Sequence, residues 1–61
     1  MNNEQKAQRY KNLMYEFDIL SNKINNIKGQ NFELSDAHQR EINQLKMKQN
    51  QIMQMVEQLM R

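Results

Sequence analysis

The stretch KGQNFELSD, residues 28–36, divides the chain into two halves that each carry a helical pattern. Gly29 is the only glycine, and a glycine just past the end of a helix can adopt the left-handed conformation without steric cost. Ser35 and Asp36 are residue types that favour helix N-termini. If Asp36 is the N-cap, Gln39 stands three residues further on, as a capping box requires. The stretch therefore predicts a turn between two helices.

Apolar side chains recur on both sides of this turn at alternating steps of three and four residues, the a and d spacing of a heptad repeat. In the first predicted helix, at about residues 3–28, these positions hold Tyr10, Leu13, Phe17, Leu20, Ile24 and Ile27. In the second, at about residues 35–60, they hold Ile42, Leu45, Gln49, Ile52, Val56 and Leu59. A turn as short as residues 29–34 brings the helices back antiparallel. The predicted fold class is all-α, with residues 1–61 forming one coiled-coil-like, antiparallel two-helix hairpin.

The composition leaves assembly as the means of stabilising so small a chain. The 61 residues contain no proline and no cysteine, so no disulfide or thiolate–metal site can staple the fold. Mean hydropathy is −1.08, yet the 38% of residues that are apolar are periodic. Burial of about a dozen seam side chains contributes ~1.5–3 kcal/mol for each side chain, whereas ordering the chain costs ~1.5 kcal/mol for every residue. The total stabilisation from burial is therefore smaller than the total entropic cost. We therefore expect assembly into a helical bundle, with a homodimeric four-helix bundle as the leading form.

The two apolar seams are expected to be offset along the hairpin by about one heptad. Counted from a turn centred near residue 31, the first seam begins about four residues away at Ile27, and the second about eleven away at Ile42. The loop residues Phe32 and Leu34 are then expected to cover the first seam near the turn. At the far end, the last apolar residues of the second helix would lie opposite polar residues of the first. This overhang predicts an assembly surface.

The predicted interface with a partner has two parts. The first is the apolar end of the second helix, where flexible methionines suit contact with a partner helix. Its residues are Ile52, Met53, Met55, Val56, Leu59 and Met60. The second part is the stretch LMYEFDIL, which is apolar on several sides and so requires more than one neighbour. Its residues are Leu13, Met14, Tyr15, Phe17, Ile19 and Leu20. A second copy, a different protein's helix and solvent all remain open as the environment of these side chains.

Gln49 interrupts the second seam at an a position. A polar residue at such a position can specify register and oligomeric state at a cost in stability. The alternative is that its amide reaches solvent and specifies nothing. The sequence leaves both interpretations open.

The sequence predicts no enzyme activity, no cofactor and no metal site. His38 is the only histidine and has no tightly spaced group of further ligands. No serine stands in a nucleophile pattern, and no glycine-rich phosphate loop is present. Lys6, Arg9 and Lys11 cluster in the first helix and could contact phosphates, but the net charge is only +2 and acidic residues flank them. A solvated basic face is the favoured interpretation.

The expected location follows from two further features. The first residues, MNNEQKAQRYK, lack the apolar core of a secretory signal peptide, and no run approaches the ~20 apolar residues of a membrane-spanning helix. We therefore expect a chain without a membrane span in a reducing, cytoplasmic compartment.

The function expected from this pattern is that of a small interaction protein, such as a chaperone, scaffold or adaptor. It would bury its heptad seams against itself or against a partner helix. The alternative is a regulatory basic helical bundle that binds nucleic acid through Lys6, Arg9 and Lys11. The salt dependence of nucleic-acid binding would separate the two classes, because phosphate contacts release counterions.

Overall fold

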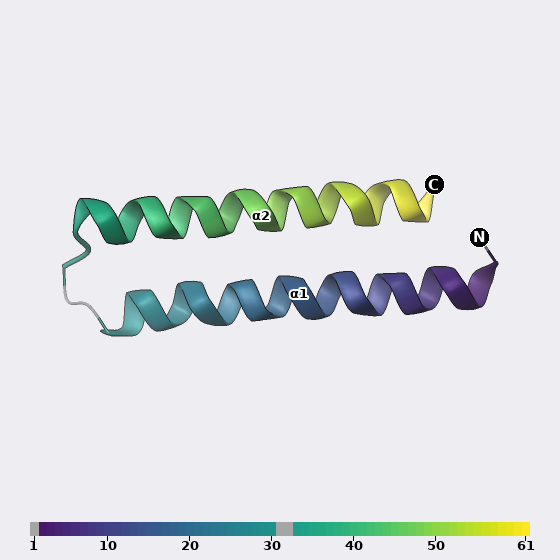
Figure 1. The fold of residues 1–61 in the computed structure, drawn as a ribbon, viewed down its shortest axis with the longest axis horizontal. Coiled ribbons are helices and arrows are strands. Elements are labelled where there is room, and N and C mark those ends of the chain that lie inside the picture. Colours follow the sequence, from purple (N-terminus) through teal and green to yellow (C-terminus); the bar gives the residue numbers. More distant parts are fainter. Residues whose placement is uncertain (1, 31–32) are drawn as a thin grey trace.

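The chain forms two antiparallel helices joined by a short connection, with both termini at the same end (Figure 1). The computed structural model describes residues 2–30 and 33–61. Helix α1 spans Asn3–Gln30 and helix α2 spans Asp36–Met60. The described residues contain no strand, and the hairpin extends 47 × 15 × 10 Å. The prediction of an all-helical hairpin is confirmed. Neither helix, over the described residues, is long and apolar enough to cross a membrane.

Helix α1 begins with a reciprocal pair of hydrogen bonds that we did not predict. The backbone N–H of Gln5 donates to the Asn2 side-chain oxygen at 2.8 Å, and the Asn2 backbone N–H lies 3.4 Å from the Gln5 side-chain oxygen. This is the capping-box arrangement, which satisfies N–H groups that have no partner within the helix. An asparagine followed three residues later by a glutamine was the available sequence signal.

Gly29 does not end α1, which corrects the predicted boundary. The helix continues to Gln30, and Gly29 does not adopt a positive φ. A glycine inside a helix costs only about 1 kcal/mol relative to alanine, so one glycine does not stop a helix whose preceding turns are well packed. The left-handed conformation expected at this position is therefore wrong.

Helix α2 is capped by Ser35 rather than by Asp36, so the capping box conditional on Asp36 does not form. The Ser35 hydroxyl oxygen accepts from the backbone N–H of His38 at 3.2 Å, and it also lies 2.8 Å from Nδ1 of the His38 ring. Gln39 instead donates its backbone N–H to the Ser35 carbonyl and its side-chain amide to Asn43. His38 thus reinforces the helix start from the third position of the helix.

Eight apolar residues make up the core between the helices, and all of them lie at the predicted a or d positions. They are Leu13, Leu20, Ile24, Ile42, Leu45, Ile52, Val56 and Leu59. Met14, Phe17 and Ile27 pack against this core and are partly buried. Tyr10 departs from the pattern, because 38% of its surface is exposed although it occupies an a position. Burial is deepest at Ile42, which has no exposed surface.

The observed register removes most of the predicted offset between the seams. The side chain of Gln49 reaches the Phe17 carbonyl and the Ser21 hydroxyl, so Gln49 lies opposite residues 17–21. In an antiparallel pair, Val56 then faces residues 10–14, where the apolar seam of α1 continues. Val56 is accordingly buried, with 7% of its surface exposed. The expected apolar overhang is therefore wrong for Val56 and Leu59, both 7% exposed, whereas Met60 is 68% exposed.

The ends of the hairpin agree with this register. At the open end, α1 extends past the last turn of α2 (Figure 1). Near the connection, Ile42 faces residues 24–28 and covers Ile24, which is 6% exposed. Leu34 is 37% exposed and gives little of the cover expected of it. Phe32, the other residue expected to cover this end, lies outside the described residues.

Candidate functional site

Gln49 links the two helices through two hydrogen bonds of its side chain. Its side-chain Nε2 donates to the backbone carbonyl of Phe17 at 3.1 Å and to the hydroxyl of Ser21 at 2.7 Å. A carbonyl oxygen can only accept, so the amide must present its NH2 group to α1. Gln49 is half-buried and does not simply extend into solvent. The interpretation that it reaches solvent is therefore wrong, whereas its role in specifying register stays a prediction.

Of the two groups that accept hydrogen bonds from Gln49, only one depends on which residue stands at that position of α1. Every residue of α1 has a backbone carbonyl like that of Phe17, so this bond could form in several registers. Ser21 carries the only serine or threonine hydroxyl in α1. The bond to Ser21 is therefore the one that distinguishes this alignment of the helices from its heptad-shifted alternatives.

The residues predicted to contact a partner divide into three groups. Five of them already form the core of the single hairpin: Leu13, Leu20, Ile52, Val56 and Leu59. Two are partly buried against that core: Met14 and Phe17. The remaining five are exposed by at least 37% of their surface: Tyr15, Ile19, Met53, Met55 and Met60. The exposed and partly buried groups have the most surface left for new contacts, because the core residues are already largely covered by the opposite helix.

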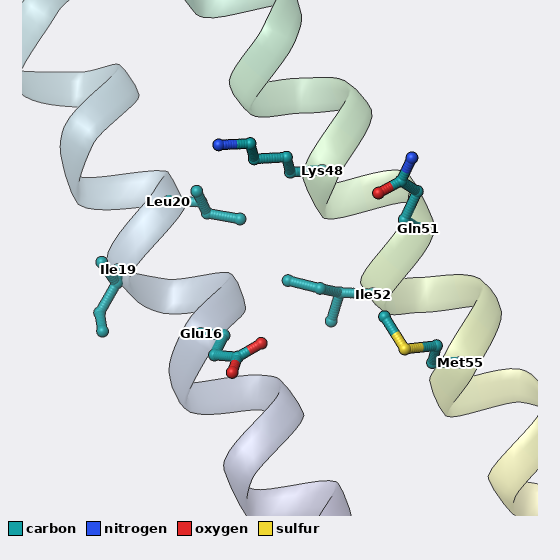
Figure 2. Close-up of a pocket in the computed structure, with 7 residues that line it drawn as sticks. All are labelled: Glu16, Ile19, Leu20, Lys48, Gln51, Ile52 and Met55. Atoms are coloured by element: carbon teal, nitrogen blue, oxygen red, sulfur yellow. The ribbon is translucent and has the colours of Figure 1, made fainter.

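Two of the exposed residues border a groove along one side of the hairpin. The groove has a volume of about 420 Å³ and is lined by Glu16, Ile19, Leu20, Lys48, Gln51, Ile52 and Met55. In Figure 2, Leu20 and Ile52 point toward each other between the helices and lie at the middle of this surface. Ile19 and Met55 supply further apolar surface from α1 and α2 respectively.

The two charged residues of the groove come from different helices and lie on opposite sides of the Leu20–Ile52 pair (Figure 2). Lys48 extends from α2 toward α1, and Glu16 directs its carboxylate from α1 toward α2. The groove therefore has an apolar middle and one charge of each sign beside it. The heptad pattern predicted Ile19, Leu20, Ile52 and Met55 in the interface but not Glu16 and Lys48, since the spacing along one helix does not identify neighbours on the other helix.

The other exposed apolar residues do not gather in this groove. Met53 and Met60 occupy e positions, which lie on the flank of α2 opposite the g-position Met55. Tyr15 and Met47 occupy outward-facing f positions and are exposed by 69% and 62%. The groove is therefore the place where exposed apolar side chains from both helices adjoin the core.

The basic residues of the alternative hypothesis do not form one face. Arg9 and Lys11 are exposed and two positions apart on α1, so their side chains point to nearly opposite sides. Lys6 is half-buried. The described residues contain no group of three histidine, cysteine, aspartate or glutamate side chains that could hold a metal ion.

No family model matches the chain, and comparisons with curated proteins and with solved structures likewise find no match.

Proposed function

We propose that the chain is a non-enzymatic protein–protein interaction module of the chaperone, scaffold or adaptor class. The hairpin binds a helical partner, either a second copy or another protein, through the apolar side chains that its own fold leaves exposed. The core formed by the a and d residues holds the two helices together. The partner is contacted from outside that core, by residues such as Ile19 and Met55.

The observation that carries this proposal is the balance between buried and exposed apolar residues. Over the described residues, eight large apolar side chains are exposed and eight are buried. Single exposed apolar residues are ordinary on protein surfaces, but apolar residues that are contiguous with a core mark interaction sites. Ile19 and Met55 adjoin the core residues Leu20 and Ile52 in this way. A helix laid in the groove would bury both helices of the hairpin more deeply.

The limited depth of the hairpin supports the same proposal. Its shortest dimension, 10 Å between Cα atoms, corresponds to a single layer of helices. Every helix of such a layer keeps water on most of its circumference. Domains of about this size commonly need a disulfide, a metal or another chain, and this chain has no cysteine.

The test is the native mass of the chain together with its helicity over a range of concentrations. Sedimentation velocity is expected to give a mass above that of one chain, and the midpoint of thermal unfolding is expected to rise with concentration. A poorly helical monomer that becomes helical only with another protein also supports the proposal. A fully helical monomer, whose unfolding midpoint is independent of concentration, would contradict it, because such a hairpin needs no partner.

Nucleic-acid binding stays the alternative prediction, and the separation of Arg9 from Lys11 does not favour it. The expected cytoplasmic location likewise stays a prediction.

A further inference from the structure

We infer that the groove between the helices binds a second copy of the same chain, related to the first by a two-fold axis. The groove is lined by Glu16, Ile19, Leu20, Lys48, Gln51, Ile52 and Met55. The axis runs across the helices and passes over the Leu20–Ile52 pair. This inference rests on the proposed function and makes it more specific, because it names the surface, the partner and the symmetry of the contact.

The arrangement of the two charges is the first reason to choose a second copy. In a two-fold contact, residue i of one copy meets residue j of the other, and j meets i. Glu16 and Lys48 lie on opposite sides of the Leu20–Ile52 pair along the helices (Figure 2). The axis exchanges these two sides, so it brings Glu16 of each copy to the end of the groove where Lys48 of the other lies. One acid and one base per copy thus make two complementary pairs.

The direction of the side chains strengthens this match. Lys48 begins on α2 but extends toward α1, the helix that carries Glu16 (Figure 2). An axis that crosses the helices stacks α1 of one copy on α1 of the other, in antiparallel order. Because the Lys48 ammonium group is displaced toward α1, it lies closer to α1 of the other copy, the helix that carries the Glu16 carboxylate. A partner helix with an unrelated sequence would have to supply both opposite charges independently.

The apolar middle of the groove is suited to the same arrangement. Leu20 and Ile52 belong to the core of the hairpin, and they are 9% and 5% exposed. Ile19 and Met55 flank them with 37% and 38% of their surfaces exposed. A copy laid over the axis places a second set of the same four side chains against the first. The contact is then apolar at its centre and charged at its margins, as protein interfaces commonly are.

The size of the face is the second reason to choose a whole hairpin as the partner. The hairpin measures 47 × 15 Å between Cα atoms, so one face is on the order of 700 Å² before side chains are added. A stable interface buries about 800 Å² on each partner. Glu16 and Lys48 lie near the middle of α1 and α2, so a two-fold axis between them overlaps the two copies along nearly their full length. The face reaches the required size only if this whole length is used.

The closing experiment exchanges the two charges and measures the dissociation constant of the dimer by sedimentation equilibrium at low salt. Glu16→Lys and Lys48→Glu are each expected to raise it by at least about tenfold, because each creates two like-charge pairs. An equimolar mixture of the two variants restores both complementary pairs between unlike copies. We expect its dissociation constant to return to within about threefold of the original value.

A matched control separates this pairing from a simple attraction of net charge. Lys46→Glu produces the same net charge as Lys48→Glu, but Lys46 is an exposed residue of α2 outside the groove. On its own, Lys46→Glu is expected to change the dissociation constant by less than about twofold, whereas Lys48→Glu raises it by at least about tenfold. A second pair tests the apolar middle: Met55→Glu should weaken the dimer by at least about tenfold, and Met47→Glu by less than about twofold. Circular dichroism of each variant establishes that it remains helical.

Each outcome bears on the inference and on the proposed function separately. A dimer that keeps its affinity in Lys48→Glu and Met55→Glu overturns the inference, but self-association and the proposed function then stand. A mixture that fails to recover affinity overturns the two-fold pairing. A poorly helical monomer overturns the second copy as the partner and leaves an interaction with another protein. A stable helical monomer contradicts both the inference and the proposed function.

Discussion

The hydrogen bond between Gln49 and Ser21 gives the sharpest prediction about what aligns the two helices. Gln49→Ala removes both donors to α1, and the two bonds together are worth about 1–3 kcal/mol. Ser21→Ala removes the 2.7 Å bond alone and is expected to cost about 0.5–1.5 kcal/mol. Both residues are half-buried, so water replaces part of each lost bond, and the lower halves of these ranges are expected.

A double-mutant cycle isolates the direct interaction. The free energy of unfolding is measured for the original chain, for each single variant and for the double variant, all at one chain concentration, by urea denaturation followed by circular dichroism. Alanine is a better helix former than either residue, but this benefit occurs in both arms of the cycle and cancels. The coupling energy is expected to be about 0.5–1.5 kcal/mol. A coupling below about 0.3 kcal/mol would refute the reasoning, because sites that do not interact are additive within that error.

Gln49→Leu separates stability from specificity. Leucine completes the apolar seam, and the Phe17 carbonyl and Ser21 hydroxyl are not deeply buried, so neither group is left without water. We therefore expect the free energy of unfolding to be unchanged or higher, while the alignment of the helices becomes less unique. A single set of backbone amide resonances is expected from the original chain, and several sets or broadened resonances from Gln49→Leu. A single sharp set from both chains would mean that Gln49 does not specify register.

Three further predictions concern the ends and the core of the hairpin. Gly29→Ala should raise the free energy of unfolding by up to about 1 kcal/mol, since Gly29 is helical and an added Cβ meets nothing within 4 Å. A lower free energy of unfolding, measured by urea denaturation, would instead indicate a left-handed conformation at this position. Ser35→Ala should lower it by about 1 kcal/mol through loss of the α2 cap, and an unchanged urea midpoint would contradict this. Val56→Asp should abolish the helical circular dichroism signal by placing a charge in the core, whereas Met60→Asp, at a residue 68% exposed, should change stability by less than about 0.5 kcal/mol. Equal effects of these two aspartates would show that the buried and exposed groups are wrongly divided.

The fold was predictable because its decisive features are local in the sequence. The heptad spacing placed all eight core residues at a or d positions, and the serine–aspartate pair located the start of α2 to within one residue. Periodicity reports which face of a helix is apolar, and that face must be buried in any two-helix arrangement. No knowledge of the tertiary structure is needed for this part of the prediction.

The alignment of the helices was not predictable in the same way, and one boundary error explains the difference. Treating Gly29 as the helix end centred the connection near residue 31, although α1 continues to Gln30 and α2 begins at Asp36. Moving the centre of an antiparallel hairpin moves every cross-helix pair with it. Val56 thereby changed from an unpartnered residue at the end of the hairpin to a core residue facing residues 10–14. Val56 and Leu59, which were predicted at an interface with a partner, lie in the core of the single hairpin for this reason.

The register that this boundary error obscured is the one in which the Gln49 amide reaches the Ser21 hydroxyl. Sliding α1 by one heptad keeps apolar residues in the seam, so apolar burial discriminates weakly between the two alignments. The same slide puts Met14 or Lys28 at the place of Ser21. Neither side chain can accept a strong hydrogen bond from the Gln49 amide. The amide would keep its bond to a backbone carbonyl but lose the hydroxyl, so a shifted register is disfavoured by about the energy of that one bond. We therefore predict that Gln49, although it interrupts the apolar seam, favours this alignment over its heptad-shifted alternatives. Only in this alignment do Glu16 and Lys48 lie on opposite sides of the Leu20–Ile52 pair, as the proposed two-fold contact requires.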